Sequence, residues 1–131
     1  MSRRAFLKSL TALMGGLALP AVAQAEVDRK AWKNLQTSPV AGFQYHRGET
    51  LWSQLANGQM LTLTREADNR YDDRAVRVDW QGHKLGYIPR LDNAVVSQLL
   101  DRGESLEAVI SKLTVSNNPW DRIAVEVGWR V

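Results

Sequence analysis

Alternation of apolar and polar residues over 75–80 constrains the fold of this chain more than any other sequence feature. The apolar members of the run share one face of an extended chain, because successive side chains of a strand point to opposite sides: Val76, Val78 and Trp80. Gln81-Gly82 follows as a two-residue turn, and residues 84–88 return as a second strand. The pattern predicts an antiparallel hairpin with one buried face.

The rest of the domain shows further strand-like runs with short helical segments between them. The additional strands are predicted over residues 40–46, 60–64, 105–115 and 123–131, with a break in alternation near Ser111. One or two helical turns are expected within residues 48–57, and a helix capped by Asp92 is expected over Asn93–Asp101. Together these segments predict a mainly β fold: a small OB-like β-barrel of five to six strands with one or two inserted short helices.

The N-terminus has the features of a twin-arginine signal peptide. Ser2–Lys8 contains paired arginines before an aromatic residue, a Leu and a Lys, and an apolar run over 10–22 leads to Ala23-Gln24-Ala25. The apolar run is shorter than the roughly 20 residues that a membrane-spanning helix needs. We expect the twin-arginine export machinery to carry the protein, with cleavage after Ala25 and no stable membrane span in the mature protein. The alternative is an amphipathic helix that packs on the domain.

The predicted domain boundaries follow from this signal. Residues 1–25 are the signal peptide, residues 26–39 have no clean period and are predicted as a leader segment, and residues 40–131 form the barrel. The expected location is periplasmic or secreted.

Charge and cysteine content limit what the domain can do. The sequence has 17 basic and 14 acidic residues, and the signal holds three of the cations, so the remainder carries 14 of each sign. A neutral domain lacks the broad positive field of a protein that coats nucleic acid, so any such binding requires a local site. The absence of cysteine excludes disulfides and thiol chemistry.

The polar turn with Asn69, Tyr71 and Asp72 has two interpretations. In the first, the Asn and Asp side chains hydrogen-bond nearby backbone and fix the turn. In the second, Tyr71 offers a ring on which a base can stack, worth about 1–3 kcal/mol, while its neighbours supply polar contacts. His46 and His83 have no metal-ligand spacing and are expected to face solvent. No serine-hydrolase motif or Gly-rich phosphate loop occurs, so we predict a binding protein rather than an enzyme, without a cofactor.

The turn over 69–72, together with Gly86-Tyr87-Ile88-Pro89, resembles the HIRAN domain. This family is a small β-barrel found in DNA-repair helicase-like ATPases and as a free-standing bacterial protein. The resemblance implies a pocket for the 3′ end of single-stranded DNA, in which an Asp-containing turn binds the terminal hydroxyl and aromatic residues hold the last bases. It places the nucleic-acid-binding residues at these positions: Tyr45, Asn69, Tyr71, Asp72, Tyr87, Arg90 and Trp120.

Particular roles and departures follow from the same resemblance. Asp72 would accept a hydrogen bond from a free 3′-hydroxyl and repel a 3′-phosphate, and Arg90 would contact phosphate. Gln44 stands where DNA-binding relatives can carry Arg, and Tyr87 where they can carry His. The alternative function is an exported domain that keeps the fold and binds an envelope protein, a peptide or a glycan. The neutral charge, Gln44 and the expected compartment favour this alternative.

Overall fold

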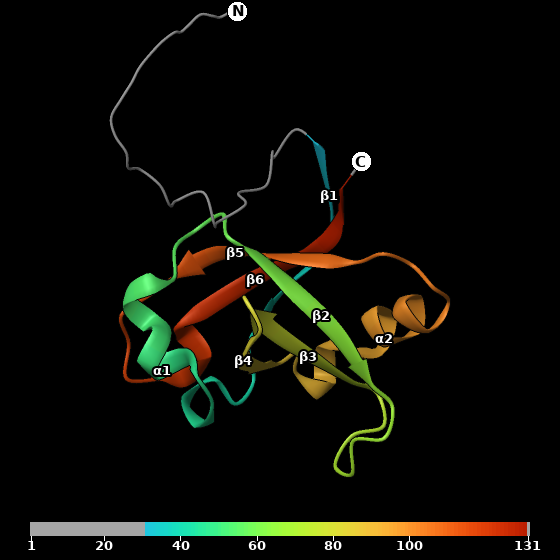
Figure 1. Cartoon of the computed structure of the whole chain (residues 1–131), viewed down its shortest axis with the longest axis horizontal. Helices are drawn as coiled ribbons and strands as arrows, with labels where there is room; N and C mark the ends of the chain where they lie inside the picture. Colours follow the sequence, from blue (N-terminus) through green and yellow to red (C-terminus); the bar gives the residue numbers. More distant parts are fainter. Residues whose placement is uncertain (1–30, 131) are drawn as a thin grey trace, which may run out of the picture.

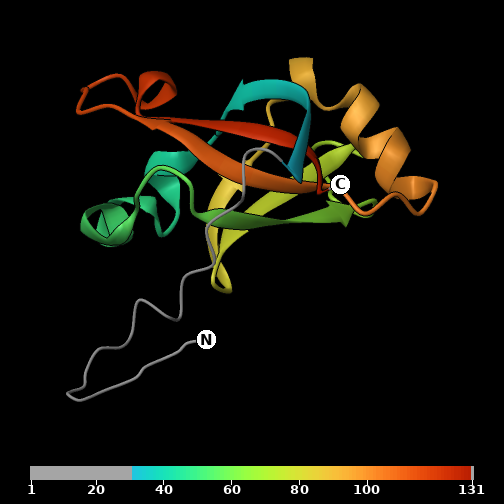
Figure 2. The same cartoon turned by 90° about the horizontal axis from the view of Figure 1, so that it is seen from above.

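The computed structural model describes residues 31–130, so the predicted signal peptide and its cleavage at Ala25 lie outside the described residues. Within this range six strands are paired antiparallel in the spatial order β1-β6-β5-β2-β3-β4 (Figures 1 and 2). The strands are β1 (Trp32–Pro39), β2 (Met60–Glu66), β3 (Ala75–Trp80), β4 (His83–Tyr87), β5 (Glu107–Leu113) and β6 (Ile123–Arg130).

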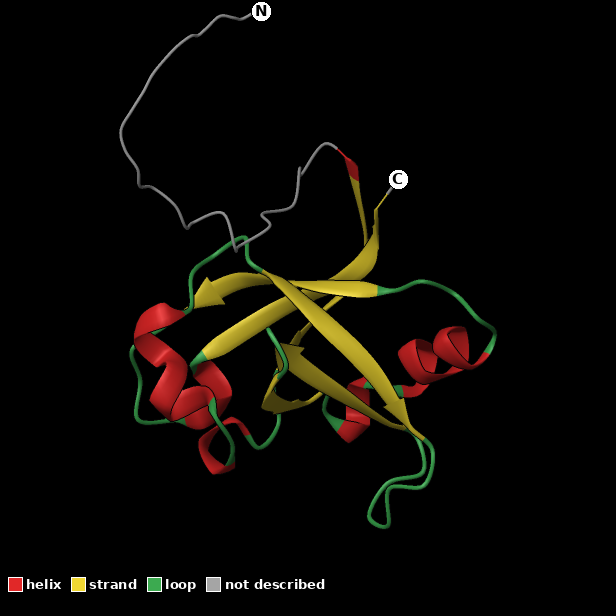
Figure 3. Cartoon of the chain, in the orientation of Figure 1, coloured by secondary structure: helices red, strands yellow, loops and turns green. Residues whose placement is uncertain are grey.

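Short helices connect the strands. The helices are α1 (Gly48–Leu51), continued by a 3₁₀ turn over Trp52–Gln54, and α2 (Ala94–Asp101), with further 3₁₀ turns at Phe43–Tyr45, Arg90–Asp92 and Pro119–Asp121. Figure 3 shows α1 and α2 on opposite sides of the strands. In the part of the chain that the structure describes, no helix is both long and apolar enough to cross a membrane.

A backbone bridge closes the sheet into a barrel. Ala41, two residues beyond β1, donates to and accepts from the backbone of Tyr87 in β4, at 2.7 and 3.0 Å. The bridge joins the segment that follows β1, the first strand of the sheet order, to β4, the last. Gly86 permits this approach, because a Cβ at that position would collide with the carbonyl oxygen of Ala41. The predicted mainly β barrel with two short helices is confirmed.

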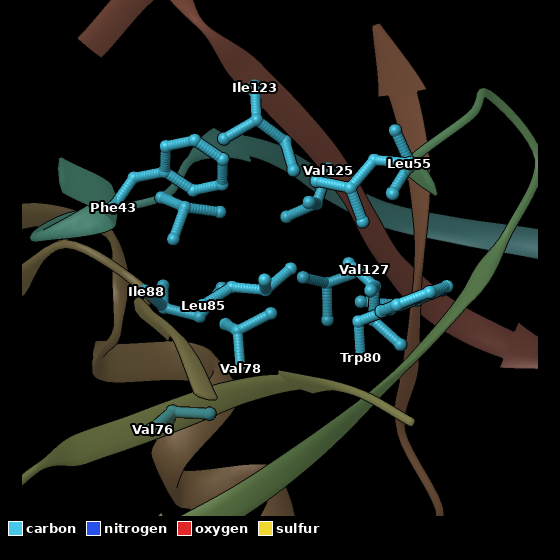
Figure 4. Close-up of a cluster of buried hydrophobic side chains, with 14 of the residues drawn as sticks. Phe43, Leu55, Val76, Val78, Trp80, Leu85, Ile88, Ile123, Val125 and Val127 are labelled. Carbon is cyan, nitrogen blue, oxygen red and sulfur yellow. The ribbon is translucent and has the colours of Figure 1, made fainter. Parts of the chain in front are cut away.

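The predicted hairpin is present and supplies much of the core. Val76, Val78 and Trp80 of β3 are buried and pack with residues of β6 inside the barrel (Figure 4). Gln81 and Gly82 have φ values of 48° and 82°, as a type I′ hairpin turn requires. The break predicted near Ser111 is also confirmed, since the β5–β6 register shifts between Ile110 and Lys112.

The first strand lies earlier than the sequence predicts. Residues 40–46 were expected to form it, yet the strand is β1, and Phe43–Tyr45 is a 3₁₀ turn. Residues 32–39, predicted as leader, therefore belong to the barrel and pair with β6 along their length. The prediction was wrong because β1 has few apolar residues and so lacks a strand-like apolar pattern. Phe43 is buried, but it lies in a turn rather than in a strand.

The start of α2 also differs from the prediction. Asn93 precedes the helix at its N-cap position instead of Asp92, and its side chain makes no cap hydrogen bond. This side chain is fully buried and hydrogen-bonds Asp72 instead. The helix therefore begins at Ala94, one residue later than expected.

Candidate nucleic-acid interface

The connection between β2 and β3 is held in place by its own polar side chains. Asn69 Oδ1 accepts hydrogen bonds from the backbone N–H groups of Tyr71 and Asp72, at 2.9 and 3.1 Å. Asp72 Oδ1 accepts from the backbone N–H of Arg74 at 3.0 Å. The turn-fixing interpretation of Asn69 and Asp72 is therefore confirmed. The same bonds present the Tyr71 side chain to solvent, where this residue is 79% exposed.

Asp72 is also tied to the start of α2. The buried Asn93 donates a hydrogen bond from Nδ2 to Asp72 Oδ2 at 2.8 Å. Both carboxylate oxygens of Asp72 thus have one protein partner, and each keeps acceptor capacity because a carboxylate oxygen has two lone pairs. These contacts orient the carboxylate and leave it able to accept further hydrogen bonds.

A second set of contacts fixes the β4 side of the site. The Tyr87 hydroxyl donates to Glu66 Oε1 at 2.7 Å, and Asn69 Nδ2 donates to the same oxygen at 3.1 Å. Burial alone would raise the pKa of Glu66, but these hydrogen bonds and the charges of Lys84 and Arg77 lower it overall. Glu66 is therefore an anion at neutral pH and holds the Tyr87 ring in one orientation.

These elements surround a cavity of about 470 Å³. Its lining residues are Ala41, His46, Asn69, Arg70, Tyr71, Asp72, Ala75, Lys84, Tyr87, Ile88 and Arg90. Five of the predicted site residues meet here, from the β2–β3 connection, β4 and the turn after it: Asn69, Tyr71, Asp72, Tyr87 and Arg90.

The cavity is locally positive. Arg70, Lys84 and Arg90 line it, and within residues 31–130 none of them forms an ion pair. Asp72 is the one acidic side chain in the lining. An excess of unpaired cations beside an exposed tyrosine suits an anionic ligand with an aromatic part.

Comparison with known proteins identifies the family. The family model for the HIRAN domain matches residues 33–129. The chain belongs to the HIRAN domain family. Two solved structures are similar to it, and no curated protein matches it.

The similar structures agree with this assignment. A crystal structure of a protein from Lactobacillus plantarum is 30% identical, with a TM-score of 0.65, and the match covers 75% of this chain and 94% of that one. The crystal structure of the HIRAN domain of human HLTF is 22% identical, with a TM-score of 0.57, and the match covers 72% and 74% of the two chains. The second likeness supports the fold alone.

Two predicted site residues of this HIRAN domain lie outside the cavity. Tyr45 is 79% exposed in the 3₁₀ turn that follows β1, and it lines neither this cavity nor the adjacent cavity that contains Trp120. Trp120 is 54% exposed and lines an adjacent cavity of about 480 Å³ with the almost fully exposed Leu91. Ala41 and Arg90 line both cavities, so the two share an edge.

The sequence did not single out three further polar residues of the HIRAN cavity, His46, Arg70 and Lys84. His46 was expected to face solvent, yet it is half-buried and lines the cavity. Burial, and then the charges of Lys84 and Arg77, lower the pKa of His46. No sequence signal marks this residue, because its position depends on the 3₁₀ turn.

No group of three or more possible metal ligands is found among residues 31–130.

Proposed function

We propose that this HIRAN domain is a non-catalytic module that binds single-stranded DNA at a free 3′ end. The observation that carries the proposal is the exposed ring of Tyr71 on a cavity with three unpaired cations. Stacking of bases on aromatic rings combined with cations along the backbone is the usual physical basis of single-strand binding.

Each side chain has a defined part in this proposal. Tyr71 stacks on the terminal base, Arg90 contacts a backbone phosphate, and Asp72 accepts a hydrogen bond from the 3′-hydroxyl. A terminal phosphate would place a second negative charge beside Asp72, so the site discriminates against it. Because Arg90 also borders the second cavity, a strand that leaves the first cavity passes toward Trp120.

Salt dependence follows from the number of phosphates contacted. Three lining cations limit direct neutralisation to about three phosphates, and each contributes a slope of about −0.7 in log affinity against log salt for single strands. We therefore expect a total slope of at most about −2. A far steeper slope would require cations outside the cavity.

The direct test is fluorescence polarisation with two short oligonucleotides, one ending in a 3′-hydroxyl and its twin in a 3′-phosphate. Titrations at two salt concentrations measure affinity and slope together. We expect binding to the 3′-hydroxyl strand and much weaker binding to the 3′-phosphate strand. Equal affinity for the two would remove Asp72 as the selector, and no affinity for either would refute the proposal.

A second candidate is an exported binding domain for an envelope protein, a peptide or a glycan. The observation that favours it is the exposure of Leu91 and Trp120 on the second cavity. Such a ligand would bind with little dependence on salt, in contrast to DNA.

The twin-arginine pattern supports export to the periplasm or beyond. The mass of the protein recovered outside the cytoplasm tests cleavage after Ala25.

A further inference from the structure

We propose that His46 and Lys84 form a phosphodiester subsite within the cavity, and that His46 takes up a proton when the phosphodiester binds. The inference rests on the proposed function and deepens it. It assigns a role to two side chains that the sequence did not single out, and it makes affinity depend on pH.

Tyr87 brings the two side chains to one place. Lys84 Nζ lies 4.4 Å from the centroid of the Tyr87 ring, and the His46 ring lies edge-on to it with centroids 6.3 Å apart. The hydroxyl of Tyr87 is held by Glu66, so this ring is a fixed support for both neighbours. Since all three side chains line the cavity, a group bound against the Tyr87 ring could contact both His46 and Lys84.

The positive charge of Lys84 beside Tyr87 and His46 is not balanced by a carboxylate partner from the described part of the chain. Several arginines elsewhere on the barrel have carboxylate partners, as in the pairs Arg65–Asp101, Arg122–Glu49 and Arg130–Glu107. Lys84 has no ion-pair partner among the described residues. The carboxylate whose charge acts on it belongs to Glu66, which already accepts from Tyr87 and Asn69 and faces Arg77 at 4.0 Å. An anion from solution is the partner that this arrangement lacks.

The groups that face His46 determine its titration. They are Lys84 and Tyr87 on β4 and Arg77 on β3, with the Glu66 carboxylate of β2 beyond the Tyr87 hydroxyl. Burial and the two cations lower the pKa of His46, so the free protein carries a neutral imidazole at pH 7. A phosphodiester oxygen beside the ring would favour the imidazolium and raise this pKa. The complex then binds more protons than the free protein, and affinity increases as pH falls.

The chain offers an internal control for the experiment. It has two histidines, and His83 lies at the start of β4 beside Trp80 and does not line the cavity. NMR titration of both imidazoles, with and without the 3′-hydroxyl oligonucleotide, gives their pKa values in the two states. We expect the pKa of His46 to rise by about one unit on binding, and that of His83 to stay unchanged. Affinity should then rise as pH falls from about 8 to about 5.5, by less than the limit of about tenfold that a one-unit rise in pKa sets.

A chemical variant of the ligand separates this inference from the proposed function. In a matched oligonucleotide, the last internucleotide phosphate is replaced by a neutral methylphosphonate. Loss of the pH-dependent gain with this oligonucleotide supports the subsite. Equal binding of both oligonucleotides at every pH, with the pKa of His46 unmoved, overturns the subsite and leaves DNA binding intact. Failure of every oligonucleotide to bind overturns both.

Protein variants then assign the two roles. His46→Gln should lose the gain in affinity that wild type shows between about pH 8 and about pH 5.5. Lys84→Gln should bind more weakly throughout this range and reduce the salt slope by about 0.7. Wild-type behaviour of both variants, with unchanged thermal unfolding, overturns the assignment.

Discussion

The two connections of the β2-β3-β4 meander differ fourfold in length although both join adjacent antiparallel strands. β3 and β4 are joined by two residues, Gln81-Gly82, whereas β2 and β3 are joined by eight, residues 67–74. The short turn shows that this sheet needs only two residues to reverse direction. The additional residues of the longer connection form one wall of the cavity.

The two connections are also held by different forces. The short turn relies on backbone conformation, with positive φ at both residues. The long connection relies on side chains: Asn69 and Asp72 bond its backbone, and Asn93 ties it to α2. A loop fixed in this way can present Tyr71 without the support of the hydrophobic core.

The most severe test of this contrast is to replace residues 67–74 with Asn-Gly. Glu66 and Ala75 form the last pair of β2 and β3, so a two-residue turn can join them. We expect oligonucleotide binding to be abolished while the barrel still folds. The free energy of unfolding should fall by about 1–3 kcal/mol, because the buried Asn93 loses Asp72. Denaturant unfolding and polarisation measure the two effects, and a variant that cannot fold would show that the connection is structural.

Tyr71→Ala separates the ring from the loop that carries it. We expect affinity for the 3′-hydroxyl strand to fall by about 1–3 kcal/mol, the value of one base–aromatic stack. The Tm should stay within a few degrees, because the side chain is exposed. Tyr45→Ala is the comparison variant, since Tyr45 is also a predicted site residue and is equally exposed but lies outside the cavity. An equal loss of affinity in the two variants would indicate that the cavity is not the centre of the site.

Gly82→Ala tests the opposite expectation for the short turn. Alanine at a φ of 82° is strained, so the free energy of unfolding should decrease by about 1–2 kcal/mol. Space is not the reason, because a Cβ at this position meets no atom within 4 Å. Affinity measured well below the melting temperature should be unchanged. A change in affinity would show that the two connections are coupled.

Glu66→Gln has the smallest expected effect and concerns acid stability. The pKa of Glu66 is lowered in the folded protein, so its ionised form contributes stability above the unfolded-state pKa. That contribution is lost as pH falls through the folded-state pKa. The variant should therefore lose less stability than wild type between neutral and acidic pH. Thermal unfolding across this pH range measures the difference between the variant and wild type. If the Tm of both proteins falls equally with pH, ionised Glu66 does not contribute to stability.

The sequence predicts regular strands better than it predicts the site. The β3–β4 hairpin and the irregularity at Ser111 follow from side-chain alternation, which is a local property. β1 was missed because its burial comes from pairing with β6, at the other end of the chain. Among the residues of the candidate site, the connection that carries Tyr71 and Asp72 was predicted from its motif, which resembles the family turn, and it lines the cavity. His46 and Lys84 are brought together by barrel closure, which no local pattern encodes.

The bridge between Ala41 and Tyr87 is a short joint in the closed barrel. Two backbone hydrogen bonds form this bridge, whereas β1–β6 and β2–β3 are paired over several residues. Both residues of the joint also line the cavity, so a ligand bound there would contact both sides of the joint. Ligand binding would then stabilise the closed form of the barrel. Slower hydrogen exchange at the amides of Ala41 and Tyr87 would report this stabilisation without any label on the ligand.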